Sequence, residues 1–132
     1  MASRHRDRPA HVAIAGGSRG IGAALALALA RPGVRLALAA RDPGTLEDRA
    51  TELRQRGAAV RLHPADLALP GAGADWLAGL ADPLPPDLVI ICLGLFGGRP
   101  APGMAEPEAL SRRLIEVNLA GAIALAEAAA AR

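Results

Sequence analysis

The sequence predicts an α/β fold, namely a doubly wound parallel sheet within one domain of 132 residues. Apolar runs of strand length alternate with longer helix-like segments, and Gly or Pro marks each switch between them. Alternating β and α units of this length imply parallel strands joined by right-handed crossovers, with helices on both faces of the sheet. We expect strands at residues 11–15, 34–40, 59–63 and 88–93, helices at about 20–31, 45–56, 75–80 and 107–132, a sheet order of 3-2-1-4, and a disordered leader at residues 1–9.

The first βα unit contains the most informative segment of the chain. Between its short apolar strand and its Leu/Ala-rich helix stands the loop Gly16-Gly17-Ser18-Arg19-Gly20-Ile21-Gly22. A strand that turns sharply into a helix N-terminus leaves backbone N–H groups unpaired, and the helix dipole adds partial positive charge there. A diphosphate fits such a site, and glycines let the backbone approach it. We therefore expect residues 16–22 to cradle the diphosphate of a nucleotide.

The second βα unit combines an apolar strand with an amphipathic helix. Thr45 can cap this helix, which runs to about Arg56 and ends at Gly57. Acidic and basic residues give the helix a solvated face, and apolar residues form an inward stripe. The members of that stripe are Leu46, Ala50 and Leu53.

The remaining units complete the alternating pattern. The turn at residues 70–73 leads to a short helix, and the Pro-rich stretch at 82–86 is a stiff connector. Residues 88–93 are nearly all aliphatic, as expected of a central parallel strand covered on both faces, and we place this strand beside the first. A Gly/Pro-rich loop at 94–103 precedes the last helix, which has Pro107 near its first turn.

This topology predicts where a ligand binds. In doubly wound sheets, ligands bind at the carboxyl ends of the strands, at the switch point between the first and fourth strands. The loops at 16–22 and 94–103 follow these two strands, so we expect both loops to line one crevice.

Composition excludes several other function classes. The fifteen basic residues are all arginine and the net charge is +2, while one Trp, one Phe and no Tyr leave little to stack on bases, so we expect no nucleic-acid partner. The uncharged run at 21–30 is far below the roughly 20 residues of a membrane span. The single Cys92 excludes an internal disulfide and fits a reducing, cytoplasmic location. We interpret it as a small buried hydrophobe, with a redox role as the alternative, and assign no metal ligands.

These residues resemble the N-terminal, coenzyme-binding half of the short-chain dehydrogenase/reductase family, over residues 10–128. The coenzyme loop of that family is usually Thr-Gly-x-x-x-Gly-Ile-Gly, and only Ala15 departs from it. The family's Thr braces the turn, so its replacement affects local rigidity more than binding. The resemblance implies a Rossmann-type fold that binds a nicotinamide dinucleotide. Its contacts in the loop would be Gly16, Ser18, Arg19, Gly20, Ile21 and Gly22.

The end of the second strand favours NADP over NAD. An NAD-preferring site places a carboxylate there to accept from the ribose 2′-OH, whereas Arg can face the 2′-phosphate of NADP. Here Ala40 takes the acidic position and Arg41 follows it, and Arg19 is a second basic group where NADP-using members of the family often have one. Either Arg alone is also consistent with a solvated surface charge. Together they can clamp a dianion, so we expect NADP, with NAD less favoured.

Two further positions match the family's coenzyme contacts. Asp66-Leu67 resembles the family's Asp-Val/Leu pair, which holds the adenine through the carboxylate and the next backbone N–H; Asp66 could equally brace the following loop. Of the family's Asn-Asn-Ala-Gly only Gly94 is kept, and it would let the backbone approach the nicotinamide-side ribose. We assign no function to His63.

Asn118 is the one position that resembles the family's catalytic apparatus. It stands in Glu116-Val117-Asn118-Leu119-Ala120-Gly121, which resembles the family's Val-Asn-Leu-x-Gly. In the family this Asn kinks a helix and holds a water of the proton relay, whereas an Asn within a helix is ordinarily a solvated surface residue. The family's Ser and Tyr-x-x-x-Lys are not matched, because this chain contains no Tyr and no Lys.

Two functions of different class stay open. In the first, the chain is the truncated, NADP-binding portion of a cytoplasmic oxidoreductase that transfers hydride between NADP(H) and a carbonyl or alcohol substrate. In the second, it is a non-catalytic NADP-binding or sensing module. We favour the first because Asn118 has no evident function without a downstream Tyr and Lys. We also expect an exposed outer edge of the fourth strand, an exposed face of the last helix, and association into a homo-oligomer.

Overall fold

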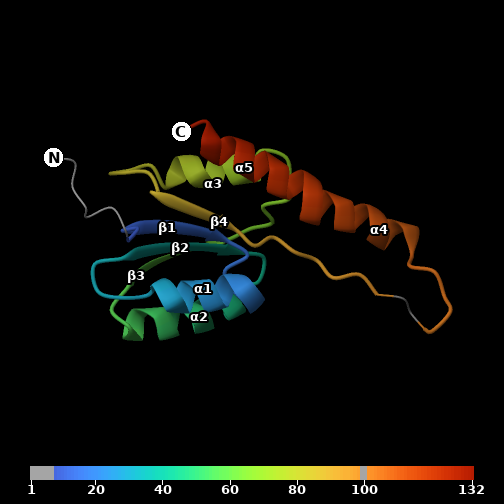
Figure 1. The fold of residues 1–132 in the computed structure, drawn as a ribbon, viewed down its shortest axis with the longest axis horizontal. Helices are drawn as coiled ribbons and strands as arrows, with labels where there is room; N and C mark the ends of the chain where they lie inside the picture. Colours follow the sequence, from blue (N-terminus) through green and yellow to red (C-terminus); the bar gives the residue numbers. More distant parts are fainter. Residues whose placement is uncertain (1–7, 99–100) are drawn as a thin grey trace.

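The computed structural model describes residues 8–98 and 101–132, and it confirms the predicted fold class. Four parallel strands form one sheet in the order β3-β2-β1-β4, and helices cover both of its faces (Figure 1). The predicted leader lies outside the described residues apart from Arg8 and Pro9, as do residues 99 and 100 of the predicted loop. The elements are β1 (His11–Ala15), α1 (Gly20–Leu29), β2 (Arg35–Ala40), α2 (Pro43–Gln55), β3 (Ala59–Pro64), α3 (Ala72–Gly79), β4 (Leu88–Ile91), α4 (Glu108–Ile115), the π-helix η1 (Glu116–Gly121) and α5 (Ala122–Ala130).

The two faces of the sheet carry side chains of different size. Because side chains alternate along a strand, β1 and β2 direct Val, Ile and Leu to one face of the sheet and a row of alanines to the other. The helices α1 and α2 cover the first face, and α3 and α5 cover the second (Figure 1). The large-residue face packs on the stripe of α2, which is fully buried as predicted. The alanine row leaves room for Trp76 of α3 and Leu125 of α5. Each fully buried Leu contributes about 1.5–3 kcal/mol by removal from water.

The helix α2 begins earlier than predicted, and Thr45 is not its cap. Asp42 is the N-cap residue: its Oδ1 accepts a hydrogen bond from the Gly44 N–H at 2.9 Å, and Pro43 occupies the first turn. The Thr45 hydroxyl instead donates to the Asp42 carbonyl at 3.3 Å, within that turn. The predicted end is confirmed, because Gly57 follows the helix with a φ of 90°.

The strand β4 is shorter and more exposed than predicted. It pairs with β1, as expected, but ends at Ile91, and its residues are at most partly buried. The reason is its place in the sheet: within the described part of the chain it has a strand on one side only, whereas β1 lies between two strands and is fully buried. The prediction of a central, fully covered strand is therefore wrong for β4 in this structure, and the predicted exposed outer edge is present.

The last helix is interrupted by a wider turn. Pro107 is its N-cap residue, and α4, η1 and α5 follow one another without a break (Figure 1). Val117, Gly121 and Leu125 are buried on the inner side, whereas the side chains of Ile115, Leu119 and Ile123 are more than half exposed. The outer side of this helix is therefore an uncovered apolar stripe.

Candidate functional site

The glycine loop packs directly against the end of β4. Gly16 has a φ of 80°, and a Cβ at this residue would collide with the carbonyl group of Cys92. A Cβ on Gly22 would likewise collide with the Gly16 carbonyl. The Gly16 N–H donates to the Ala39 carbonyl at 2.8 Å, which anchors the loop to β2. Glycine is thus required at both positions because backbone occupies the space of a side chain.

The middle of the same loop presents unpaired backbone donors. Within the described part of the chain, the N–H groups of residues 18–22 have no hydrogen-bond acceptor, and the first helical bond runs from the Ala23 N–H to the Arg19 carbonyl at 3.2 Å. Gly20 has a φ of 55°, and no atom lies within 4 Å of the position of a Cβ there. An anion can therefore approach a row of donors at the positive end of α1. These features fit the diphosphate of a dinucleotide.

Three charged residues stand at this end of the sheet: Arg19 in the glycine loop, and Arg41 and Asp42 directly after β2. Arg19 and Arg41 are both exposed, and Nη2 of Arg19 lies 3.7 Å from Oδ2 of Asp42. Hydrogen bonds from Thr45 and from the Gly44 N–H, together with the positive charge of Arg19, lower the pKa of the Asp42 carboxyl. Asp42 is therefore ionised at neutral pH. The sequence interpretation identified the two arginines but gave this carboxylate no function.

Asp66 is held on both of its carboxylate oxygens. Oδ1 accepts from the Ala68 N–H at 3.0 Å, and Oδ2 pairs with Arg113 of α4. Arg113 in turn lies 3.1 Å from the Glu116 carboxylate, and these hydrogen bonds, to Glu116 and then to Asp66, raise the pKa of its guanidinium. The loop-bracing alternative for Asp66 is thus present, in addition to an ion pair that sequence reasoning missed. Nothing in the local sequence marks a partner that lies 47 residues away.

Leu67 is the second residue of the expected adenine pair, and its side chain and its N–H have different surroundings. Its side chain is buried against Trp76 and Leu77. Among the described residues, its N–H has no hydrogen-bond acceptor. Leu67 as a whole is 3% exposed, so this unpaired N–H belongs to a residue that is almost fully buried.

Asn118 holds the segment that follows β4. Its Oδ1 accepts from the Leu95 N–H at 2.7 Å, and its Nδ2 donates to the Leu95 carbonyl at 2.8 Å. The residue lies within η1, so the wider turn of the helix coincides with this two-point contact. Asn118 is therefore not simply a solvated surface residue. Gly94, one residue before the contact, has no atom within 4 Å of the position of a Cβ.

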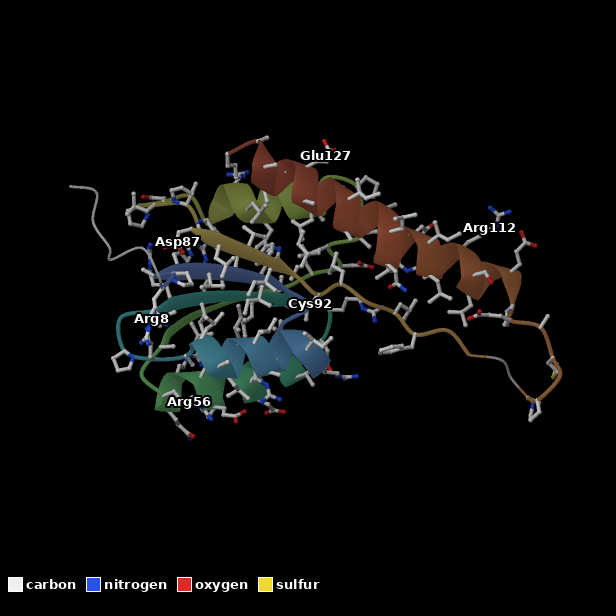
Figure 2. All side chains as sticks on the ribbon, viewed as in Figure 1. Arg8, Arg56, Asp87, Cys92, Arg112 and Glu127 are labelled. Carbon is white, nitrogen blue, oxygen red and sulfur yellow. The ribbon has the colours of Figure 1, made fainter. Side chains whose placement is uncertain are left out.

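The structure thus gathers the predicted residues along one end of the sheet. The loop at 16–22 contacts the end of β4 at Cys92, which Figure 2 shows where the chain leaves the sheet toward α4. The neighbouring ends of β2 and β3 are joined by a hydrogen bond from the Ala65 N–H to the Ala40 carbonyl at 2.9 Å. Arg41 directly follows Ala40, and Asp66 directly follows Ala65, so the two residues leave neighbouring strand ends.

The side chains of His63 and Cys92 have structural surroundings that give them no part in the coenzyme site. His63 stacks on Trp76 with ring centroids 6.2 Å apart, and burial raises the pKa of the Cys92 thiol, which disfavours a reactive thiolate. Two hollows are present elsewhere. One, of about 170 Å³, lies at the amino ends of the strands, and the other, of about 230 Å³, lies between residues 67–74 and 120–125.

Within the described ranges, no group of three or more His, Cys, Asp or Glu side chains is placed to hold a metal ion. No helix in these ranges is long and apolar enough to cross a membrane.

Comparison with known proteins identifies the family. The sequence matches the short chain dehydrogenase family over residues 10–132, and the chain belongs to that family. No curated protein sequence matches it.

Solved structures agree with this assignment. A metagenomic short-chain oxidoreductase in complex with NADP is 34% identical, with a TM-score of 0.77 over 92% of this chain and 55% of that one. A 3-oxoacyl-[acyl-carrier protein] reductase from Brucella melitensis is 28% identical, with a TM-score of 0.77 over 93% of this chain and 49% of that one. An NAD+-bound xylitol dehydrogenase shares the fold at 24% identity, with a TM-score of 0.78 over 89% of this chain and 45% of that one. The chain spans about half the length of these proteins.

Proposed function

We propose that this chain is the NADP-binding portion of an oxidoreductase that transfers hydride between NADP(H) and a carbonyl or alcohol substrate. The observation that carries the proposal is the row of unpaired N–H groups at residues 18–22, flanked by Arg19 and Arg41. The row supplies donors for a diphosphate, and the two guanidinium groups supply positive charge for a 2′-phosphate. Ala40 stands where an NAD site would place a carboxylate.

The adenine end of the coenzyme would lie at the carboxyl end of β3. The Leu67 N–H can donate to a ring nitrogen of adenine, and the Asp66 carboxylate can accept from the exocyclic amine. Both oxygens of Asp66 already have a partner, but a carboxylate has about four lone-pair sites, so a further hydrogen bond fits. Arg113 would then orient the carboxylate for the adenine.

The nicotinamide end would lie over Gly94, where the backbone is open to a ligand. The bound coenzyme supplies or accepts the hydride. Reduction of a carbonyl also needs a proton donor for the developing alkoxide, and Asn118 belongs to the water-holding position of the family's relay. Because these 132 residues include no Tyr and no Lys, we expect no turnover by the chain alone.

A second candidate, of a different class, is a non-catalytic NADP-binding or sensing module, which would use the donors of residues 18–22 but needs no proton relay. The coding sequence after Arg132 distinguishes the two: an in-frame Ser and Tyr-x-x-x-Lys supports the oxidoreductase, and a stop codon supports the module. In either case we propose a cytoplasmic homo-oligomer. The single free cysteine and the uncovered stripe of Ile115, Leu119 and Ile123 support this proposal.

Calorimetric titration with NADPH and NADH tests the coenzyme proposal. We expect NADPH to bind more tightly than NADH, and Arg19→Gln or Arg41→Gln to weaken NADPH roughly tenfold, because each removes a charge-assisted contact. Arg112→Gln is the matched control, since Arg112 pairs with Glu108 of its own helix. Equal affinity for the two coenzymes, or equal losses in all three variants, would refute the proposal.

A further inference from the structure

We propose that Asp42 is a specificity-determining residue that opposes NADP at its own binding site, because its carboxylate competes with the 2′-phosphate for Arg19. The inference rests on the proposed binding of NADP. It gives a function to Asp42, which has no part in the coenzyme site as proposed above from the glycine loop and the two arginines.

The contacts of Asp42 fix its carboxylate beside Arg19. Oδ1 accepts from the Gly44 N–H at 2.9 Å as the cap of α2, and Oδ2 lies 3.7 Å from Nη2 of Arg19. Both side chains of the ion pair are more than half exposed, so solvent and an incoming anion reach them. The cap hydrogen bond holds the Asp42 carboxylate at the start of α2, within ion-pair distance of Arg19. Its position therefore has an anchor in the fold besides the attraction to Arg19.

The local charge balance follows from this placement. Arg19 and Arg41 together carry two positive charges, and Asp42 offsets one of them at the surface that would face the 2′-phosphate. A 2′-phosphate is close to a dianion at neutral pH, so it is repelled by Asp42 and must share the Arg19 guanidinium with it. A ribose 2′-OH carries no charge and escapes this repulsion. Asp42 therefore lowers the affinity for NADP and leaves the affinity for NAD almost unchanged.

The position of Asp42 distinguishes it from an NAD-selecting carboxylate. Such a carboxylate stands at the last residue of the second strand, where it accepts from the ribose hydroxyl, and here that position is Ala40. Asp42 comes two residues later, at the start of α2. Asp42 would repel the 2′-phosphate of NADP without offering a hydrogen bond to the ribose 2′-OH of NAD. It would therefore change specificity by weakening one ligand and not by strengthening the other.

Asp42→Asn tests the inference with little change in structure. Asn is as good an N-cap residue as Asp, so α2 keeps its cap while the charge is lost. The ligands are 2′,5′-ADP and 5′-AMP, which differ only in the 2′-phosphate, and both are titrated calorimetrically into the full chain. The matched control is Asp48→Asn, which makes the same change in net charge at an exposed position of the same helix.

We expect Asp42→Asn to tighten 2′,5′-ADP about 3- to 5-fold, at the upper end of what exposed ion pairs contribute, because the ligand carries a dianion. The affinity for 5′-AMP should change less than about twofold, and Asp48→Asn should affect neither ligand. The gain should shrink at high salt because exposed charges are then screened. An equal gain in the two variants, an equal gain for the two ligands, or no gain overturns the inference.

Failure of the inference is distinguishable from failure of the coenzyme proposal. If the unmodified chain prefers 2′,5′-ADP but Asp42→Asn adds nothing, the NADP proposal stands and the inference is wrong. If the unmodified chain binds both ligands equally or binds neither, the NADP proposal fails and the inference fails with it. Asp42→Ser, which also retains a capping side chain, must give the same gain, and thermal unfolding of each variant establishes that it is folded.

Discussion

Replacing Gly16 with alanine should destabilise the protein more than replacing a glycine of similar conformation elsewhere. Gly16 and Gly33 have φ values of 80° and 85°, so both substitutions force alanine into the left-handed region. At Gly33 no atom lies within 4 Å of the new Cβ. At Gly16 the new Cβ would collide with the Cys92 carbonyl, which belongs to backbone and cannot move without displacing the end of β4.

The expected magnitudes follow from the backbone conformation and from the collision. The left-handed conformation alone costs about 1–2 kcal/mol, which is the expected destabilisation for Gly33→Ala. Gly16→Ala adds the cost of inserting a methyl group into packed backbone, about 1–3 kcal/mol, for a total of about 2–5 kcal/mol. Gly33→Ala thus serves as an internal reference, and the difference between the two variants isolates the contact with β4.

Urea unfolding of the two variants and of the unmodified chain, followed by the fluorescence of the buried Trp76, measures both free energies. Equal destabilisation by the two substitutions would refute the reasoning, because the loop would then not rest on β4. A smaller loss for Gly16→Ala than for Gly33→Ala would refute it as well.

Three further results are expected. The pKa of Asp42 is lowered in the folded state, so the stability that its ionised form contributes is present above the ordinary value of 3.8 and is lost as the pH falls through the folded pKa. Asn at this position keeps its cap at every pH, so the melting temperature of the unmodified chain minus that of Asp42→Asn should be constant above about pH 5 and fall below pH 3.8. A difference independent of pH would contradict this. Asn118→Ala removes both hydrogen bonds to Leu95 and should cost about 1–3 kcal/mol while speeding amide exchange at Leu95, and unchanged exchange would argue against the contact. Leu53→Ala, in the buried stripe of α2, should cost about 2–5 kcal/mol in urea unfolding, and a loss below about 1 kcal/mol would be inconsistent with its burial.

Local patterns were sufficient to predict the order of elements and much of the site. The apolar runs and the stripe of α2 predict which faces are buried. Burial of apolar surface is the main force that favours folding, and the apolar residues therefore recur with the period of the helix or strand that buries them. The glycine spacing at 16–22 predicted the loop, because only glycine fits where backbone meets backbone. The helix cap was placed wrongly because Asp42 and Thr45 are both capable cap residues, and the choice depends on where the chain leaves β2.

The sequence by itself determined the alternation of strands and helices, the donor-rich glycine loop and the pair of arginines beside it. These features depend on residues close together in the chain, whose chemistry and spacing can be read directly. Only the tertiary structure decided that Arg113 pairs with Asp66, that Asn118 holds Leu95, and that Asp42 stands beside Arg19. Each of these contacts joins residues that are 23 or more positions apart, and it exists because the parallel sheet brings separate strand ends to one edge.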